Sequence, residues 1–248
     1  MPLRLLWASW PNPELNLAFE WALLELARRG ACPSTLRLWV NGPCVVVDRS
    51  CGSLAEVRLP ACESLGLPVL RRPTAGGAVY HDEGNLNWTV LVRRSDLPEG
   101  VRWPREAERL AGEAILSLLS RYGLQGSFRP GEGAFAFGRK ISGLAIYAGR
   151  EAIMIHGTLL ISSDLARLRE ALYCKYEVVN LSELLGRPVE VRGVGELLAS
   201  CLAGAFDAEL EEGGPSEEEL SLASACLPRV RLPKPNKLGP PEARGGRS

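Results

Sequence analysis

A run of small and polar residues between two strand-like segments, residues 71–87, constrains this chain more than any other feature. Two arginines precede a turn of small residues, and a histidine, an acid and two asparagines follow it. Glycines in such a turn let backbone N–H groups approach a ligand closely, and a neighbouring arginine suits a phosphate or carboxylate. The alternative is a glycine-rich hairpin turn between two strands. The polar residues that follow favour a ligand site.

The strand pattern after this turn separates a polar face from an apolar one, because successive side chains point to opposite sides of a strand. The alternating residues are Asn85, Asn87 and Thr89 on one face and Leu86, Trp88 and Val90 on the other.

The remaining patterns predict groups of strands with helices between them. Strands are expected at 3–9, 35–40, 44–48, 68–72, 85–92, 134–137, 140–147 and 151–161, and Asn41-Gly42 is expected to join the second and third as a hairpin. Helices are expected at 13–29, 61–65, 105–122, 163–173, 191–210 and 216–225. The acidic stretch 207–219 is expected to be a solvated face or loop. This order argues for an α+β fold with a largely antiparallel or mixed sheet.

Composition narrows the class of protein. The formal net charge of the 248 residues is zero, which gives no bulk electrostatic argument for a nucleic-acid or membrane partner. The sequence predicts neither a signal peptide nor a membrane span, so a cytoplasmic protein is expected. The seven cysteines form no Cys-x-x-Cys pair, which argues against zinc. Most are expected to be small buried residues.

Two further segments carry candidate chemistry. Of the 29 basic residues 25 are arginine, so a lysine inside the folded part needs a reason. Lys140 opens a strand after a turn, and its compact ammonium suits a narrow site that a guanidinium does not fit. His156 lies in an apolar strand and is one of only two histidines. The alternatives are a surface lysine and a hydrogen-bonded core histidine.

Taken in order, the three segments resemble the lipoate–protein ligases and their octanoyltransferase relatives. The motifs are Arg-Arg…Gly-Gly…His-Asp-x-Gly-Asn, then Gly-Arg-Lys-Ile-Ser-Gly, then His-Gly-Thr-Leu-Leu. The resemblance runs from residue 3 to about 210 and includes Asn16 and Glu20. It implies a small, single-domain member with a class II synthetase-like α+β catalytic domain at 1–212. Residues 213–248 would then form a short helix and a disordered tail rich in Pro, Gly and Arg.

The resemblance also implies a reaction and its partners. In the ligases, ATP activates lipoate as lipoyl-adenylate with Mg²⁺ at the phosphates, and a lysine of a lipoyl domain then takes the acyl group. The acceptors would be lipoyl domains of 2-oxoacid dehydrogenase complexes or the glycine cleavage H protein. A small member of this type is expected to need a separate accessory subunit.

By the same resemblance, Lys140 contacts the carboxylate and phosphate during activation, and Glu132 is the candidate magnesium ligand. Val79, Leu144 and Ile146 are candidates for an acyl pocket, with core packing as the alternative. The residues implied in substrate or ATP binding are Arg72, Thr74, Ala75, Gly76, Gly77, Val79, His81, Asn85, Asn87, Ser142, Gly143, Ala145, His156, Gly157 and Thr158.

Departures from the family pattern leave alternatives open. Ala75 replaces the usual third glycine of the turn, and the Asn-Asp pair that ligases carry before the lysine is absent. Cys174 follows His156 at about the distance of the nucleophile in one octanoyltransferase class, and thiolate attack on a carrier-protein thioester needs no ATP. The further alternatives are a lipoate or lipoyl-domain binder without activity and a biotin ligase. The latter is disfavoured because the arginine–glycine pattern of that branch is missing.

Overall fold

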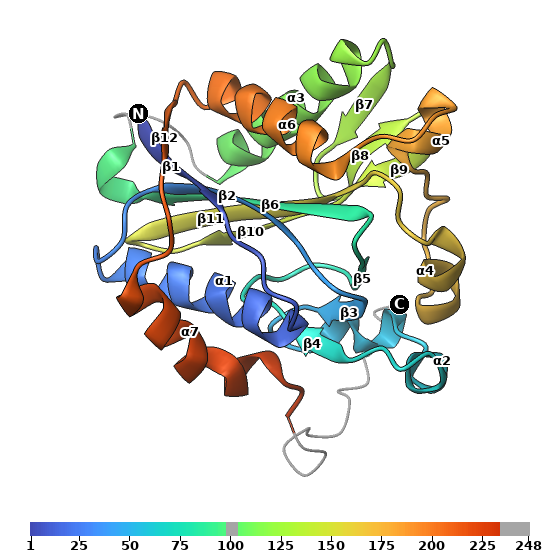
Figure 1. Cartoon of the computed structure of the whole chain (residues 1–248), viewed down its shortest axis with the longest axis horizontal. Helices are drawn as coiled ribbons and strands as arrows, with labels where there is room; N and C mark the ends of the chain where they lie inside the picture. Colours follow the sequence, from blue (N-terminus) through green and yellow to red (C-terminus); the bar gives the residue numbers. More distant parts are fainter. Residues whose placement is uncertain (98–103, 234–248) are drawn as a thin grey trace, which may run out of the picture.

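A six-stranded mixed sheet forms the centre of the computed structural model, which describes residues 1–97 and 104–233 (Figure 1). In spatial order, its strands are β10 (Leu144–Ala148), β11 (Ala152–Leu160), β6 (Asn85–Arg93), β2 (Thr35–Val40), β1 (Pro2–Trp7) and β12 (Glu209–Glu212). β1 runs parallel to β2 and to β12, and the other neighbours are antiparallel. The predicted α+β class with a mixed sheet is therefore confirmed.

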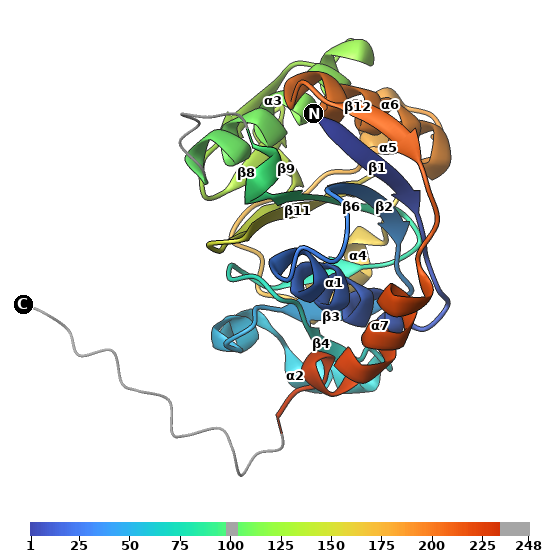
Figure 2. The ribbon, with the colours of Figure 1, turned by 90° about the vertical axis from the view of Figure 1, so that its left-hand side faces the viewer.

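Helices cover both faces of this sheet (Figures 1 and 2). α3 (Arg105–Arg121) and α6 (Val191–Ala205) pack on one face. α1 (Pro13–Arg28) packs on the other, and α7 (Glu217–Val230) lies against α1. The apolar stripe of each amphipathic helix thus meets the sheet or a neighbouring helix.

The alternation predicted for 85–92 is confirmed, and it divides the core from the polar side of the sheet. Leu86, Trp88 and Val90 belong to the cluster beneath α3 and α6. On the opposite face Asn85 bonds to Asn87, and Thr89 bonds to Glu20 of α1. One strand therefore supplies both the main core and a buried polar surface.

Two small sheets carry the other candidate segments. The first consists of β4 (Val69–Arg71), β3 (Cys44–Val47) and β5 (Val79–His81) in that order, and the second of β7 (Gly126–Arg129), β8 (Gly133–Ala136) and β9 (Arg139–Ser142). The glycine turn connects β4 to β5, which both pair with β3 and not with each other. The hairpin-turn alternative for this turn is therefore wrong.

Short elements complete the described part of the chain. They are the helices α2 (Leu59–Ser64), α4 (Leu165–Ala171) and α5 (Leu181–Leu185) and the 3₁₀ turns η1 (Gly52–Glu56) and η2 (Arg94–Asp96). The predicted helix at 163–173 is shorter than expected because Asp164 caps it by accepting a hydrogen bond from the Arg167 N–H. The predicted last helix is longer, beginning after a Ser216 capping box and ending at Val230.

The Asn41-Gly42 hairpin prediction is wrong. β2 and β3 form as strands, but β2 pairs with β1 and β6, whereas β3 belongs to another sheet. Asn41 is buried, and its side chain contacts Asn16 and His81 instead of serving an exposed turn. The pair marks a crossover between two sheets.

Three other predictions need correction. The strand expected at 140–147 is two strands, β9 and β10, which separate at Gly143 and enter different sheets. The helix expected at 191–210 ends at Ala205, and part of the acidic stretch forms the edge strand β12. Pairing with β1 uses only the backbone of β12, which leaves its acidic side chains in solvent. Strand β7 was not predicted, and most of the predicted disordered tail lies outside the described residues.

The cysteine prediction is largely confirmed. All seven cysteines are free thiols, and every one except Cys174 is buried. Within residues 1–97 and 104–233, no helix has the length and apolar character needed to cross a membrane.

Candidate active site

A cavity of about 760 Å³ lies where the glycine turn, the β9–β10 break and strand β11 meet. Fifteen of the predicted site residues line it: Arg72, Gly76, Gly77, Val79, His81, Asn87, Glu132, Lys140, Ser142, Gly143, Ala145, His156, Gly157, Thr158 and Cys174. Three predicted residues, Thr74, Ala75 and Asn85, do not line its wall. The Thr74 hydroxyl accepts a hydrogen bond from Arg72 Nε, and the side-chain amide of Asn85 donates to Asn87 Oδ1. The three sequence segments therefore converge on one space.

Lys140 lines this cavity, and two hydrogen bonds fix its backbone. Its N–H donates to the Glu177 carbonyl over 2.7 Å, and its carbonyl accepts from the Val179 N–H over 3.0 Å. Among the described residues no carboxylate oxygen lies within 4.0 Å of its Nζ, and the nearest ring is Tyr176 at 5.6 Å. Burial lowers the pKa of Lys140, and the charges of Glu132 and Glu56 oppose that effect. The ammonium therefore remains available to a ligand.

Arg72 ties the glycine turn down from inside. The buried guanidinium donates to the carbonyls of Val46, Ala75 and Gly77 and, through Nε, to Thr74 Oγ1. Burial lowers its pKa to about 10, so it still carries a charge at neutral pH. All three nitrogens already bond to the protein. Arg72 thus shapes the turn and contributes positive charge to the cavity that it lines, and the ligand contact predicted from the sequence stays a prediction.

The turn itself meets the conformational demands of its residues. Gly76 has a φ of +111°, a backbone conformation that residues with a side chain rarely adopt. Ala75 is not among the residues with positive φ, so the loss of the usual third glycine is tolerated. The departure at Ala75 therefore does not distort the turn.

His156 connects the turn to the buried core. Its Nδ1 lies 3.2 Å from Glu20 Oε2, and its Nε2 lies 2.7 Å from Thr74 Oγ1. Burial raises the pKa of Glu20, but the hydrogen bond with His156 and the charge of Arg37 outweigh burial and lower it to about 2. An ionised Glu20 only accepts, so Nδ1 of His156 donates to it, and the other ring nitrogen lies against the Thr74 hydroxyl. His156 therefore connects Glu20 of α1 to Thr74 of the glycine turn.

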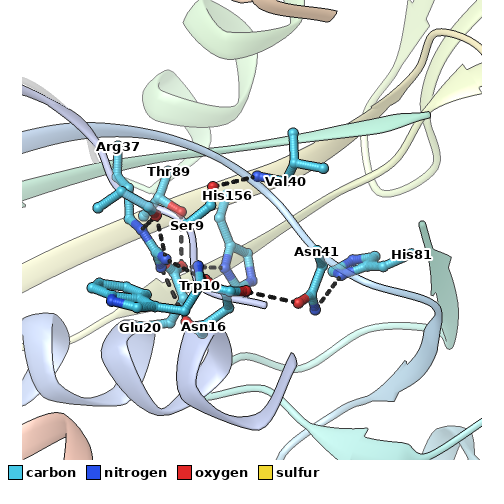
Figure 3. Close-up of polar contacts among 11 residues, drawn as sticks. Ser9, Trp10, Asn16, Glu20, Arg37, Val40, Asn41, His81, Thr89 and His156 are labelled. Carbon is cyan, nitrogen blue, oxygen red and sulfur yellow. Dashed lines mark hydrogen bonds and ion pairs between the residues drawn. The ribbon is translucent and has the colours of Figure 1, made fainter. Parts of the chain in front are cut away.

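Glu20 and Arg37 form an ion pair that is completely buried (Figure 3). Arg37 Nη1 donates to Glu20 Oε1 over 2.7 Å, and its other bonds go to the backbone carbonyls of Ala8 and Asn16 and to Asn16 Oδ1. Thr89 also donates to Glu20. The pair is fully hydrogen-bonded, which is the condition under which buried charges are tolerated.

A second branch of this network reaches His81 (Figure 3). Asn16 donates to Asn41 Oδ1 over 3.0 Å, and Asn41 Nδ2 lies 3.4 Å from His81 Nδ1. Burial and the charge of Arg72 lower the pKa of His81 to about 3, so the ring is neutral. Its edge packs against Trp39, with ring centroids 5.7 Å apart. Both histidines are therefore held by one buried network.

The cavity wall combines apolar surface with unused polar atoms. Leu17, Val79, Leu144 and Leu160 line it, whereas Ile146 packs against the core instead. Within the described part of the chain, four residues that line the cavity each carry a buried side-chain atom without a hydrogen-bond partner: Trp39 Nε1, Asn87 Nδ2, Trp88 Nε1 and Ser142 Oγ. Such atoms call for a bound partner, since leaving them unpaired is costly. A cavity with an apolar wall and a few polar groups is typical of a site for a small molecule that is largely apolar.

Glu132 does not fit the predicted role of magnesium ligand. Its carboxylate lies 3.3 Å from Lys175 Nζ and 3.7 Å from Arg129 Nη1, and these cations already balance its charge. No cluster of three or more Asp, Glu, His or Cys side chains suited to a metal occurs within residues 1–97 and 104–233. The carboxylate of Glu132 is therefore engaged by neighbouring cations and is not assigned to a metal.

Cys174 lies at the exposed rim of the cavity, after α4. Burial of the sulfur raises the pKa of its thiol, whereas the charges of Arg169, Arg58 and Lys140 act to lower it. A protonated thiol is a weak nucleophile, whereas positive charge near the sulfur favours the reactive thiolate.

Several functional-site residues were missed by sequence reasoning. Arg37, Asn41 and Trp39 lie on or next to β2, Glu56 is the last residue of η1, and Tyr176 follows α4. Their partners lie far away along the chain, as for Glu20 and His156, 136 residues apart. The one available signal was an arginine within the apolar strand pattern of 35–40.

Comparisons with known proteins agree with this geometry. Residues 12–203 match the family model "Lipoyl protein ligase A/B catalytic domain". A putative lipoate-protein ligase A of Aeropyrum pernix is 32% identical over 200 residues, covering 75% of this chain and 73% of the relative. The octanoyltransferase LipM of Kyrpidia tusciae is 29% identical over 262 residues, covering 90% and 94%. The chain spans about half the length of some relatives, such as the probable ligase of Mycoplasma pneumoniae at 50%.

Solved structures share the fold. A lipoate-protein ligase A bound with ATP superposes with a TM-score of 0.80 at 25% identity, covering 92% of this chain and 95% of that one. The putative lipoate protein ligase Ta0514 of T. acidophilum with bound lipoic acid gives 0.78 at 24%, covering 92% and 96%.

Fold and site together define an acyl-group-handling enzyme on a class II synthetase-like α+β scaffold. Within that class, the chain belongs to the lipoyl protein ligase A/B catalytic-domain family. The predicted family and the prediction that the chain is an enzyme of the ligase or octanoyltransferase type are confirmed.

Proposed function

We propose that this chain attaches lipoate to a lysine of a lipoyl domain in two steps that consume ATP. First, the lipoate carboxylate attacks the α-phosphorus of ATP, and the bond to pyrophosphate breaks to give lipoyl-adenylate. Second, the acceptor amine attacks the acyl carbon and loses a proton, and AMP leaves. The name of the A. pernix relative and the ATP-bound neighbour support this reaction.

The observation that carries the proposal is the position of Lys140. Its ammonium has no carboxylate partner within 4.0 Å among the described residues and shares the cavity with the glycine turn and His156. Bringing a carboxylate to a phosphate places two anions together, and a preorganised cation offsets their repulsion. The apolar wall would hold the acyl chain. The Glu20–His156–Thr74 contacts would hold the turn in place.

We infer the acceptors from the family. They are lipoyl domains of 2-oxoacid dehydrogenase complexes or the glycine cleavage H protein, with the reaction in the cytoplasm. One structural neighbour is a bi-partite ligase of Thermoplasma acidophilum, described together with its E2 lipoyl domain. At 24% identity that likeness supports the fold alone. An accessory subunit stays a prediction, as does magnesium, which would neutralise ATP phosphates when bound.

Lipoate-dependent ATP–pyrophosphate exchange tests the proposal. Lys140→Ala should lower exchange by about 10²–10³-fold, the usual cost of losing one preorganised group. Lys140→Arg should also fail, because a planar guanidinium does not replace a compact ammonium in a closed site. Arg139→Ala is the matched control, since it removes a neighbouring charge that does not line the cavity. Full exchange in Lys140→Ala would contradict the proposal.

A second candidate is an octanoyltransferase that uses Cys174. Cys174 shares the cavity with Lys140, and the octanoyltransferase LipM of Kyrpidia tusciae is among the relatives, at 29% identity. In this reaction the thiolate attacks a carrier-protein thioester and releases the carrier thiol. The acceptor lysine then displaces the cysteine. The raised pKa of the thiol argues for the ligase.

Transfer from octanoyl-carrier protein without ATP separates the two candidates. If Cys174 is the nucleophile, Cys174→Ala abolishes transfer, and mass spectrometry finds an octanoyl adduct on the wild-type thiol. The ligase requires that Cys174→Ala retain lipoate-dependent exchange and that no adduct form.

A further inference from the structure

The carboxylate of Glu56 lies on the glycine turn. Its Oε2 accepts a hydrogen bond from the Ala78 N–H over 2.8 Å. A Cβ added at Gly77 would stand 2.8 Å from Oε2 and 3.4 Å from Oε1. The absence of a side chain at Gly77 therefore gives a carboxylate access to the backbone of the turn.

The same carboxylate faces the cations of the cavity. Glu56, Arg72, Gly77 and Lys140 all line it. The charge of Glu56 acts to raise the pKa values of Arg72 and Lys140, against burial, which lowers both. An anion on this turn is thus attracted by two positive groups and one backbone N–H. These are the features that the proposed reaction requires of a site for a phosphate or carboxylate.

A hydrogen bond fixes the backbone of Glu56, whereas its exposed side chain is held by a single hydrogen bond among the described residues. Its carbonyl accepts from the Tyr173 N–H over 2.8 Å, and it is the last residue of η1. Glu56 is an exposed residue, and Ala78 is the only hydrogen-bond partner of its carboxylate within the described chain. Rotation into solvent would break one exposed hydrogen bond and uncover the turn.

We propose that Glu56 occupies the anion position of the glycine turn in the free protein and that the anionic group of the substrate displaces it. This inference rests on the proposed function, which supplies the anion. A small anion that displaces Glu56 gains only the contacts with the glycine turn. A ligand with an acyl chain also gains the apolar wall, so Glu56 favours acyl-bearing ligands over free phosphate. Glu56 is a positioning residue that sets the affinity of the site.

Binding of inorganic pyrophosphate, measured by isothermal titration calorimetry without turnover, tests the inference. Glu56→Gln keeps an acceptor for the Ala78 N–H but removes the charge, and it should bind pyrophosphate about tenfold more tightly than the wild type. Glu56→Ala should also bind more tightly. Glu63→Gln on α2 is the control for net charge, because Glu63 does not line the cavity, and it should match the wild type.

Two results would overturn the inference. If Glu56 only supports the turn, Glu56→Gln behaves as the wild type and Glu56→Ala binds more weakly. If none of the proteins binds pyrophosphate, the turn is not an anion site.

The exchange assay on the same variants keeps the two proposals apart. Tighter pyrophosphate binding by Glu56→Gln in a protein without exchange refutes ATP-dependent ligation and leaves the Glu56 inference standing. Exchange activity without tighter pyrophosphate binding by Glu56→Gln refutes the Glu56 inference and leaves ATP-dependent ligation standing.

Discussion

Replacing Glu20 by glutamine tests whether the buried network supports the fold. The change leaves the Arg37 guanidinium buried without its counter-charge, and breaking a buried pair in this way typically costs 3–5 kcal/mol. The pKa of Glu20 gives a similar value by a separate route. Its fall from 4.5 to about 2 on folding corresponds to about 3 kcal/mol of stability at neutral pH. We therefore expect Glu20→Gln to destabilise the protein by about 3 kcal/mol.

Urea unfolding at pH 7 and at lower pH is the measurement. Because the folded pKa of Glu20 is depressed, its contribution is complete above about pH 4.5 and is lost as the pH falls towards about 2. The difference between wild type and Glu20→Gln should shrink over that interval. Glu25→Gln on the same helix is the control, because Glu25 pairs with exposed arginines and should cost about 0.5 kcal/mol or less.

Two outcomes would refute this reasoning. The first is a difference below about 1 kcal/mol at pH 7, which would mean that Arg37 tolerates the loss of its partner. The second is a difference that does not change between pH 5 and pH 2, which would separate the cost from the charge of Glu20.

Three further predictions concern the cavity. Gly77→Ala should fill the space against Glu56 and abolish pyrophosphate binding in calorimetry, with little change in unfolding midpoint, since Gly77 does not have a positive φ. Gly157→Ala places a Cβ 2.5 Å from the Gly143 carbonyl and 2.6 Å from the Trp88 ring, so urea unfolding should show a loss of about 1–3 kcal/mol. Burial lowers the pKa of His81 from 6.5 to about 3, so the unfolded state takes up its proton first and stability should fall as the pH drops through this range. His81→Gln should flatten that part of the stability–pH curve, and an unchanged slope would contradict the assignment.

The parts of the site that depend on local chemistry were predictable from the sequence. Glycine permits close backbone approach, and a lone lysine among arginines stands out, so the turn and Lys140 could be identified without a structure. Alternation alone identified the polar face around Asn87. These signals need only neighbouring residues.

The contacts that organise the site were not predictable, because their partners are distant in sequence. Arg37 meets Glu20 from 17 residues away, and His156 meets it from 136. Asn41 followed by glycine has the composition of a hairpin turn, yet the buried side chain of Asn41 accepts a hydrogen bond from Asn16. Local propensity was overridden there by a buried hydrogen bond. The role proposed for Glu56 depends on a contact between the end of η1 and the glycine turn, and this contact carried no sequence signal.

The division of labour between arginine and lysine explains why this site needs both. A guanidinium carries five N–H donors in a rigid fork, and Arg37 and Arg72 each use theirs to join backbone carbonyls from separate segments. Arg37 and Arg72 use most of those donors within the fold, so their guanidinium groups are not free to follow a reacting group. The ammonium of Lys140 lines the same cavity as Arg72 and has no ion-pair partner within 4.0 Å in the described chain, so in the proposed reaction it would be free to follow charge from carboxylate to phosphate. Exchanging the two residue types would therefore remove rigidity from the turn and freedom from the reacting position.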